Sequence, residues 1–65
     1  MNNLKQLREN LKLSQKEIAD KINITQQAYS LIESQKILPS LVVAEKISNL
    51  FEKSINEIFF AKQNN

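Results

Sequence analysis

Residues 15–34 hold the feature that most constrains how this chain folds. Six apolar side chains there follow the spacing of two short helices that meet at a tight turn: Ile18, Ala19, Ile22, Ile24, Tyr29 and Ile32. The first three share one face of a helix, and Ala19 is small enough to let another helix approach closely. The spacing therefore predicts two short helices packed against each other.

The ends of both helices are also marked in the sequence. Ser14 and Glu17 form a capping-box pattern, so the first helix is expected to begin at Gln15. Asn23 lies where the chain must leave that helix through a left-handed conformation. Thr25 is an N-cap residue by chemistry and predicts a second helix from about Gln26 to Ser34. Together these signals predict a helix-turn-helix motif over about 15–34.

The outward face of the second helix carries no charge. Gln26, Gln27, Ser30 and Leu31 face out, whereas Tyr29, Ile32 and Glu33 face inward, with Ala28 near them. An uncharged face is also found on ordinary solvated helices. A glutamine amide, however, pairs a donor with an acceptor and so matches N7 and N6 of adenine in the major groove. Apolar surface from Thr25 and Leu31 suits a thymine methyl. The predicted base-reading residues are Thr25, Gln26, Gln27, Ser30 and Leu31.

Several segments resemble the Cro and lambdoid phage repressor family, the XRE-type helix-turn-helix domains. They are Leu13–Ala19, Ile24–Gln27, Ile32–Glu33 and Pro39–Leu41, and the likeness runs from about Leu4 to Phe59. The resemblance implies a lambda repressor-like DNA-binding fold of bacterial or phage type. It implies adenine and guanine contacts from the two glutamines, and a Gln15 that hydrogen-bonds a phosphate and braces Gln26.

The chain departs from that family in its loops. It has no glycine, although the family commonly has glycine where Asn23 stands and Asn-Gly where Ser34-Gln35 stands. Left-handed cap positions are therefore expected to fall to asparagine or to be avoided.

The rest of the chain predicts a single all-α domain over residues 1–65, with five helices and no sheet. Leu4, Leu7 and Leu11 form the stripe of a first helix, and Val43, Ala44, Ile47, Leu50 and Phe51 form that of a fourth. Pro39 separates the third helix from the fourth. A capping box at 54–57 opens a last short helix that carries Ile58 and Phe59 inward.

Arg8 falls on the apolar stripe of the first helix, and a charge there needs a partner. Glu33 takes an equally inward position on the second helix of the motif, so a partly buried Arg8–Glu33 ion pair is expected. The family resemblance implies the same pair. The alternative is two unpaired surface charges.

The net charge indicates whether DNA is a partner, and the apolar residues not assigned to the core indicate where a second copy of the chain could bind. Nine Lys and Arg against seven Asp and Glu give a net charge of +2, which agrees with DNA binding without establishing it. The expected phosphate contacts are Ser14, Gln15, Lys16, Ser34 and Lys36.

One small module reads about half a site, so a homodimer on a palindromic operator is expected. Its interface is predicted at Ile37, Leu38, Val42 and Phe60, although scattered surface apolar residues are also normal.

Composition narrows the classes of function. The chain has no Cys and no His, hence no zinc site of the usual kind, no thiol nucleophile and no histidine base. We expect no enzyme activity, no cofactor or metal, no small-molecule ligand and no membrane span, and a cytoplasmic location. Two functions from different classes fit the pattern. The first is a sequence-specific DNA-binding transcriptional regulator acting as a repressor, and the second is a helical protein-interaction module that uses the same exposed face.

Overall fold

Side-chain caps decide where four of the five helices begin. In the computed structural model, which describes residues 2–60, the hydroxyls of Ser14, Thr25, Ser40 and Ser54 each accept the backbone N–H three residues ahead. Glu17 and Glu57 complete capping boxes at two of these starts. The predicted capping boxes and the predicted Thr25 cap are confirmed.

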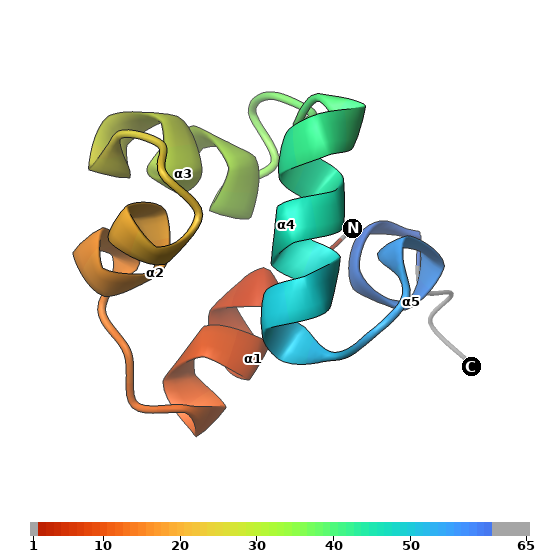
Figure 1. Cartoon of the computed structure of the whole chain (residues 1–65), viewed down its shortest axis with the longest axis horizontal. Helices are drawn as coiled ribbons and strands as arrows, with labels where there is room; N and C mark the ends of the chain where they lie inside the picture. The colour runs from red at the N-terminus through yellow and green to blue at the C-terminus, as the bar shows by residue number, and fades with distance from the viewer. Residues whose placement is uncertain (1, 61–65) are drawn as a thin grey trace.

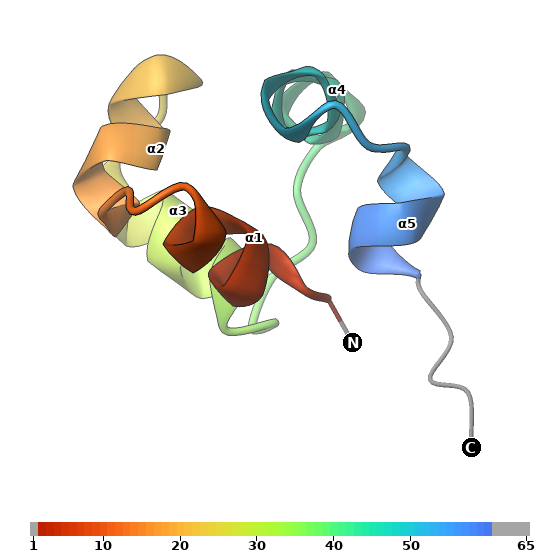
Figure 2. The ribbon, with the colours of Figure 1, turned by 90° about the horizontal axis from the view of Figure 1, so that it is seen from below.

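The described residues form an all-α fold without strands, as predicted (Figure 1). Its helices are α1 (Leu4–Asn10), α2 (Gln15–Lys21), α3 (Gln26–Glu33), α4 (Leu41–Phe51) and α5 (Ile55–Phe59). Seen from below, α1, α2 and α3 lie on one side of the molecule and α4 with α5 on the other (Figure 2). No helix in residues 2–60 combines the length and the apolar character that crossing a membrane requires.

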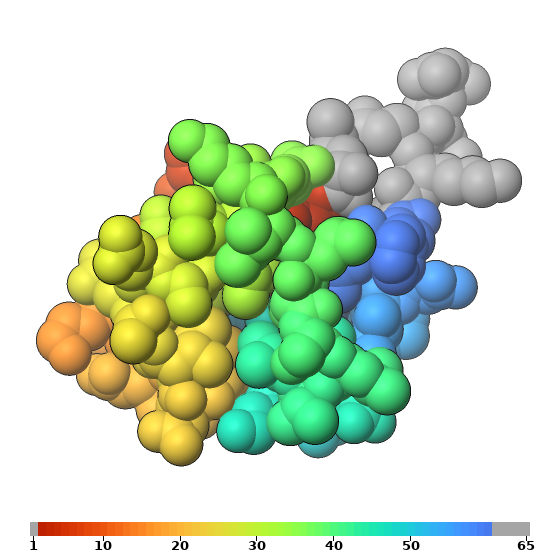
Figure 3. All heavy atoms as spheres, turned by 90° about the horizontal axis from the view of Figure 1, so that it is seen from above, coloured from red at the N-terminus to blue at the C-terminus, as the bar shows by residue number. Residues whose placement is uncertain are grey.

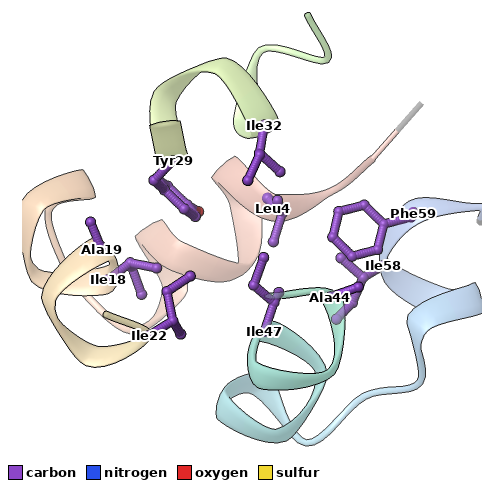
Figure 4. Packing of buried hydrophobic residues seen from close by; sticks show 10 residues of the cluster. All are labelled: Leu4, Ile18, Ala19, Ile22, Tyr29, Ile32, Ala44, Ile47, Ile58 and Phe59. Atoms are coloured by element: carbon purple, nitrogen blue, oxygen red, sulfur yellow. The ribbon is translucent and has the colours of Figure 1, made fainter. Parts of the chain in front are cut away.

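One core joins the two sides. Its ten buried residues come from all five helices and the turn after α2: Leu4, Ile18, Ala19, Ile22, Tyr29, Ile32, Ala44, Ile47, Ile58 and Phe59. Leu4 lies between Ile32 of α3 and Ile47 of α4, so α1 links the helix-turn-helix to the last two helices (Figure 4). The core packs the buried face of α3 and leaves its opposite face outward.

Four residues in the left-handed region end the first four helices, and three of them are not asparagine. They are Lys12, Asn23, Gln35 and Glu52, with φ of 58°, 61°, 66° and 55°. The expectation that such positions would fall to asparagine or be avoided is therefore wrong for three of the four. In every case the following residue donates its N–H to a carbonyl five residues back, to Arg8, Ala19, Leu31 and Ser48 respectively. These bonds close Schellman turns and offset a left-handed penalty of about 1–2 kcal/mol per residue.

The first of these turns also corrects the predicted stripe of α1. Leu11 is 51% exposed and caps the helix, which ends at Asn10. Leu11 thus lies at the C-terminal end of α1, directly before the turn at the left-handed Lys12. Residues 1 and 61–65 of the predicted 1–65 domain lie outside the described residues.

Candidate nucleic-acid interface

The outward face of α3 is uncovered and slightly hollowed. Figure 3 shows α3 and the segment after it at the surface, with the side chains of α3 in yellow to yellow-green. A surface hollow of about 500 Å³, here called the α3 hollow, is lined by Gln15, Gln26, Gln27, Ser30 and Leu31. It brings together four of the five predicted base-reading residues with the first residue of α2.

Those four side chains differ in exposure. Gln26 and Gln27 are exposed in the first turn of α3, and Ser30 and Leu31 are half-buried one turn later. Thr25 is exposed just before the helix, where its Oγ1 accepts the N–H of Ala28 at 3.0 Å. The two glutamine amides therefore stand foremost at the N-terminal end of α3, where base contacts of a helix-turn-helix are usually made.

A nearly buried ion pair joins α1 to α3. Arg8 Nε donates to Glu33 Oε2 at 2.9 Å, and Arg8 Nη2 donates to Glu33 Oε1 at 3.0 Å. The side chains are only 13% and 6% exposed. Arg8 Nη1 also donates to the carbonyl of Leu13 at 2.9 Å, just ahead of the α2 cap. Arg8 thus fixes the start of α2 and the end of α3 relative to α1.

The pair changes the proton affinity of both groups. The hydrogen bond with Glu33 raises the pKa of Arg8, outweighing the opposite effect of burial. Burial alone would raise the pKa of Glu33, but the hydrogen bonds from Arg8, with smaller contributions from Tyr29 and Gln15, outweigh it and hold that pKa below its usual value. Next to the pair, burial raises the pKa of Tyr29, whose hydroxyl lies beside Glu33 without a well-aligned hydrogen bond. Because its pKa is lowered, Glu33 is a charged carboxylate at neutral pH.

Gln15 belongs to this network as well as to the α3 hollow. Its Nε2 donates to Glu33 Oε1 at 3.2 Å, and its side chain is half-buried. The family resemblance implied that Gln15 hydrogen-bonds a phosphate and braces Gln26. The bond to Glu33 was not expected, because only the tertiary fold brings the first residue of α2 beside the last residue of α3.

The other residues predicted to contact DNA phosphates lie around the motif, and their side chains have different partners. Ser14 Oγ accepts the N–H of Glu17, which leaves its own O–H free to donate. Lys16 forms an exposed ion pair with Asp20 at 3.2 Å. Ser34 Oγ donates back to the carbonyl of Leu31 at 3.3 Å, and Lys36 is exposed in the loop after α3. In residues 2–60 no group of acidic side chains could hold a metal ion.

The predicted dimer residues are all exposed but do not form one uniform patch. Leu38 and Phe60, 80% and 62% exposed, line a mostly apolar groove of about 260 Å³ between the loop, α4 and α5. Ile37 lines a neighbouring hollow that shares Leu38, and Val42 lines neither. Leu41, 70% exposed, lines the groove and was missed. Its signal was available, since an apolar residue directly after the Ser40 cap precedes the buried stripe of α4.

The fold and the uncovered α3 face define a helix-turn-helix DNA-binding domain. A family model described as helix-turn-helix matches residues 4–58. The chain is also similar to an uncharacterized HTH-type transcriptional regulator, YgzD of Bacillus subtilis (strain 168), with 30% identity over 64 residues, or 98% of this chain and 97% of the relative. The chain belongs to the XRE-type helix-turn-helix family, whose members are generally not enzymes. It is a DNA-binding transcription regulator.

Proposed function

We propose that this protein is a sequence-specific repressor that binds a palindromic operator as a homodimer, with α3 in the major groove. The observation that carries the proposal is the α3 hollow, where two exposed glutamine amides stand beside half-buried Ser30 and Leu31. The only charged residue of α3 is Glu33, which is buried and paired. Specific contacts of this face are therefore hydrogen bonds and apolar contacts to base edges.

Phosphate contacts supply the unspecific share of the affinity. The residues proposed for them are Ser14, Gln15, Lys16, Ser34 and Lys36, together with the uncharged N-termini of α2 and α3. Lys16 can exchange Asp20 for a phosphate at small cost, because both side chains are more than half exposed. Repression then requires only that the bound domain occupy a site that the polymerase needs.

The experiment for DNA reading is selection of bound duplexes from a random pool. We expect enrichment of a two-fold symmetric site containing adenine, with half-sites about 10 base pairs apart. The variant Gln26→Ala, Gln27→Ala is expected to lose the enrichment. Gln6→Ala, an exposed glutamine of α1 outside the interface, is the matched control and should keep it. If the wild type enriches no sequence, the same face serves a protein partner instead and the proposal is wrong.

Dimerisation is proposed through the apolar groove and its exposed rim, where Leu38 and Phe60 lie with Leu41. Sedimentation equilibrium tests it. Leu38→Ser and Phe60→Ser should weaken self-association, whereas Leu11→Ser removes an exposed leucine elsewhere and should leave it unchanged. A wild type that stays monomeric at the concentration where it occupies the operator would contradict the homodimer.

A further inference from the structure

The two residues ahead of α1 connect the two sides of the molecule. Asn3 donates its backbone N–H to the carbonyl of Ile58 in α5 at 3.2 Å. Within residues 2–60 this is the only hydrogen bond between the α1–α3 side and the α4–α5 side, and no ion pair joins them. Figure 2 shows the segment before α1 running from α1 toward α5. The connecting segment 34–40 and the apolar core, where Leu4 lies beside Ile47, hold the two sides together otherwise (Figure 4).

Asn2 ties this segment to the end of α3. Its Nδ2 donates to the carbonyl of Ile32 at 3.0 Å, across 30 positions of the chain, and its Oδ1 accepts the N–H of Leu4 at 3.2 Å. The side chain is half-buried, so both bonds are partly shielded from water. Through Asn2 and Asn3, here called the Asn2–Asn3 bridge, the last turn of α3 is connected to α5 by hydrogen bonds.

The bridge acts on orientation more than on cohesion. Apolar contacts are non-directional, so the core opposes separation of the two sides more strongly than rotation of one side against the other. A hydrogen bond, in contrast, weakens steeply when its angle is distorted. The Asn2–Asn3 bridge therefore fixes the direction of α3 relative to α4 and α5.

The two sides have different tasks in the proposed homodimer. The α3 hollow lies on the first side, and the apolar groove proposed for dimerisation lies at α4 and α5. Asn2 lines a hollow of about 160 Å³ next to that groove, and Leu38, Pro39 and Phe59 line both. Asn2 is thus located where the end of α3 meets the proposed interface.

In a two-fold symmetric dimer, the interface fixes α4 and α5 of both copies. The separation and the rotational phase of the two α3 helices then depend on the direction of α3 within each copy, and the half-sites must match them. We propose that Asn2 is a positioning residue that sets the half-site spacing accepted by the homodimer. This inference rests on the proposed function, in which the apolar groove forms the interface and α3 enters the major groove.

The test measures how binding depends on half-site spacing. The selected operator and two copies, one with a central base pair inserted and one with a central base pair deleted, are titrated at one salt concentration. Each such change moves the half-sites by about 3.4 Å and turns them by about 34°. The wild type should therefore bind the selected spacing at least about 10-fold more tightly than either copy.

The variant Asn2→Asp breaks the bond to Ile32 and retains the bond to Leu4. Its carboxylate keeps an oxygen for the N–H of Leu4 but has no donor for the carbonyl of Ile32. A hydrogen bond between neutral groups shifts an equilibrium by about 2- to 13-fold net. The spacing preference of Asn2→Asp should therefore fall by at least about twofold from the wild-type ratio.

Two further variants separate positioning from charge and from folding. Asn10→Asp makes the same exchange at an exposed position of α1 and should keep the wild-type spacing preference. Asn2→Ala adds no charge and should lower the preference as Asn2→Asp does. Asn2 lies outside the core cluster, so both of its variants should fold. On a duplex with one half-site, Asn2→Ala should bind as tightly as the wild type, because a single α3 has no spacing to match.

The failures are distinguishable. A purely structural Asn2 would weaken binding to all three operators and to the single half-site by the same factor, which would overturn the inference while the proposed function stands. A wild-type dimer that binds the three spacings equally would overturn the inference as well. A wild type that occupies the operator as a monomer would overturn the homodimer and the inference with it, and one that selects no sequence would overturn the proposed function.

Discussion

Replacing Arg8 with methionine tests the nearly buried ion pair that joins α1 to α3. The substitution removes three donors, two on the Glu33 oxygens and one on the Leu13 carbonyl. It leaves a carboxylate that is 6% exposed with the Gln15 amide as its remaining donor. Removing one partner of such a buried pair costs about 3–5 kcal/mol. A domain of 65 residues has a free energy of unfolding of about 3–10 kcal/mol in total, so Arg8→Met should lose a large share of its stability at 25 °C.

The assay is urea unfolding followed by far-ultraviolet circular dichroism at neutral pH. The double variant Arg8→Met, Glu33→Leu removes both charges and should recover most of the lost free energy, because an apolar pair of similar volume often equals a buried ion pair. The reasoning is refuted if Arg8→Met lowers the free energy of unfolding by less than about 1 kcal/mol, which is the range of exposed pairs.

Acid provides a second check on the same pair. The pKa of Glu33 is lower in the folded protein than its usual value of 4.5, so its stabilising contribution is complete above that value and is lost as the pH falls through the folded pKa. The wild type should therefore lose stability below about pH 4.5 more steeply than the double variant. Glu17 and Glu57 retain a share of the acid dependence in both proteins, because hydrogen bonds from Ser14 and Ser54 lower their pKa values.

Three further outcomes are expected. Gln35→Gly should raise the melting temperature, with a gain of up to about 1 kcal/mol, because glycine adopts a φ of 66° without a Cβ clash; a lower melting temperature would show that the position is unstrained. Thr25→Ala should cost about 0.5–2 kcal/mol in urea unfolding, and Thr25→Ser should cost much less since it retains the cap on Ala28. Lys36→Ala should reduce the salt slope of operator binding by about one unit, whereas Lys46→Ala on α4 should not; equal slopes would remove Lys36 from the phosphate contacts.

Local chemistry made much of the fold predictable. Ser14, Thr25 and Ser54 mark helix starts because a hydroxyl three residues before a backbone N–H acts within one turn. The Arg8–Glu33 ion pair could be predicted because both residues fall on the apolar, inward faces of their helices, where a charge needs a partner. Each inference needed only the sequence within one or two helices.

The errors occurred where the backbone or the tertiary fold decided. The backbone hydrogen bonds of the Schellman turns outweigh the conformational preference of the residue at the left-handed position. Three such positions are therefore held by Lys12, Gln35 and Glu52, and no side-chain pattern in the sequence predicts them. Leu11 is exposed because α1 ends at Asn10, one residue before it, which the apolar spacing does not indicate. The uncharged outward face of α3 could be predicted from the spacing within one helix. The hydrogen bond from Gln15 to Glu33 could not, because it joins residues that are 18 positions apart.

The central claim is that the exposed glutamines of α3 read bases. Its most direct test is the binding free energy of wild type and Gln26→Ala on the selected operator and on a scrambled duplex of the same length, at one salt concentration. The account predicts a loss of about 1–3 kcal/mol on the operator and almost none on the scrambled duplex. Equal losses on the two duplexes would show that Gln26 contributes to DNA binding without reading sequence, which contradicts the account.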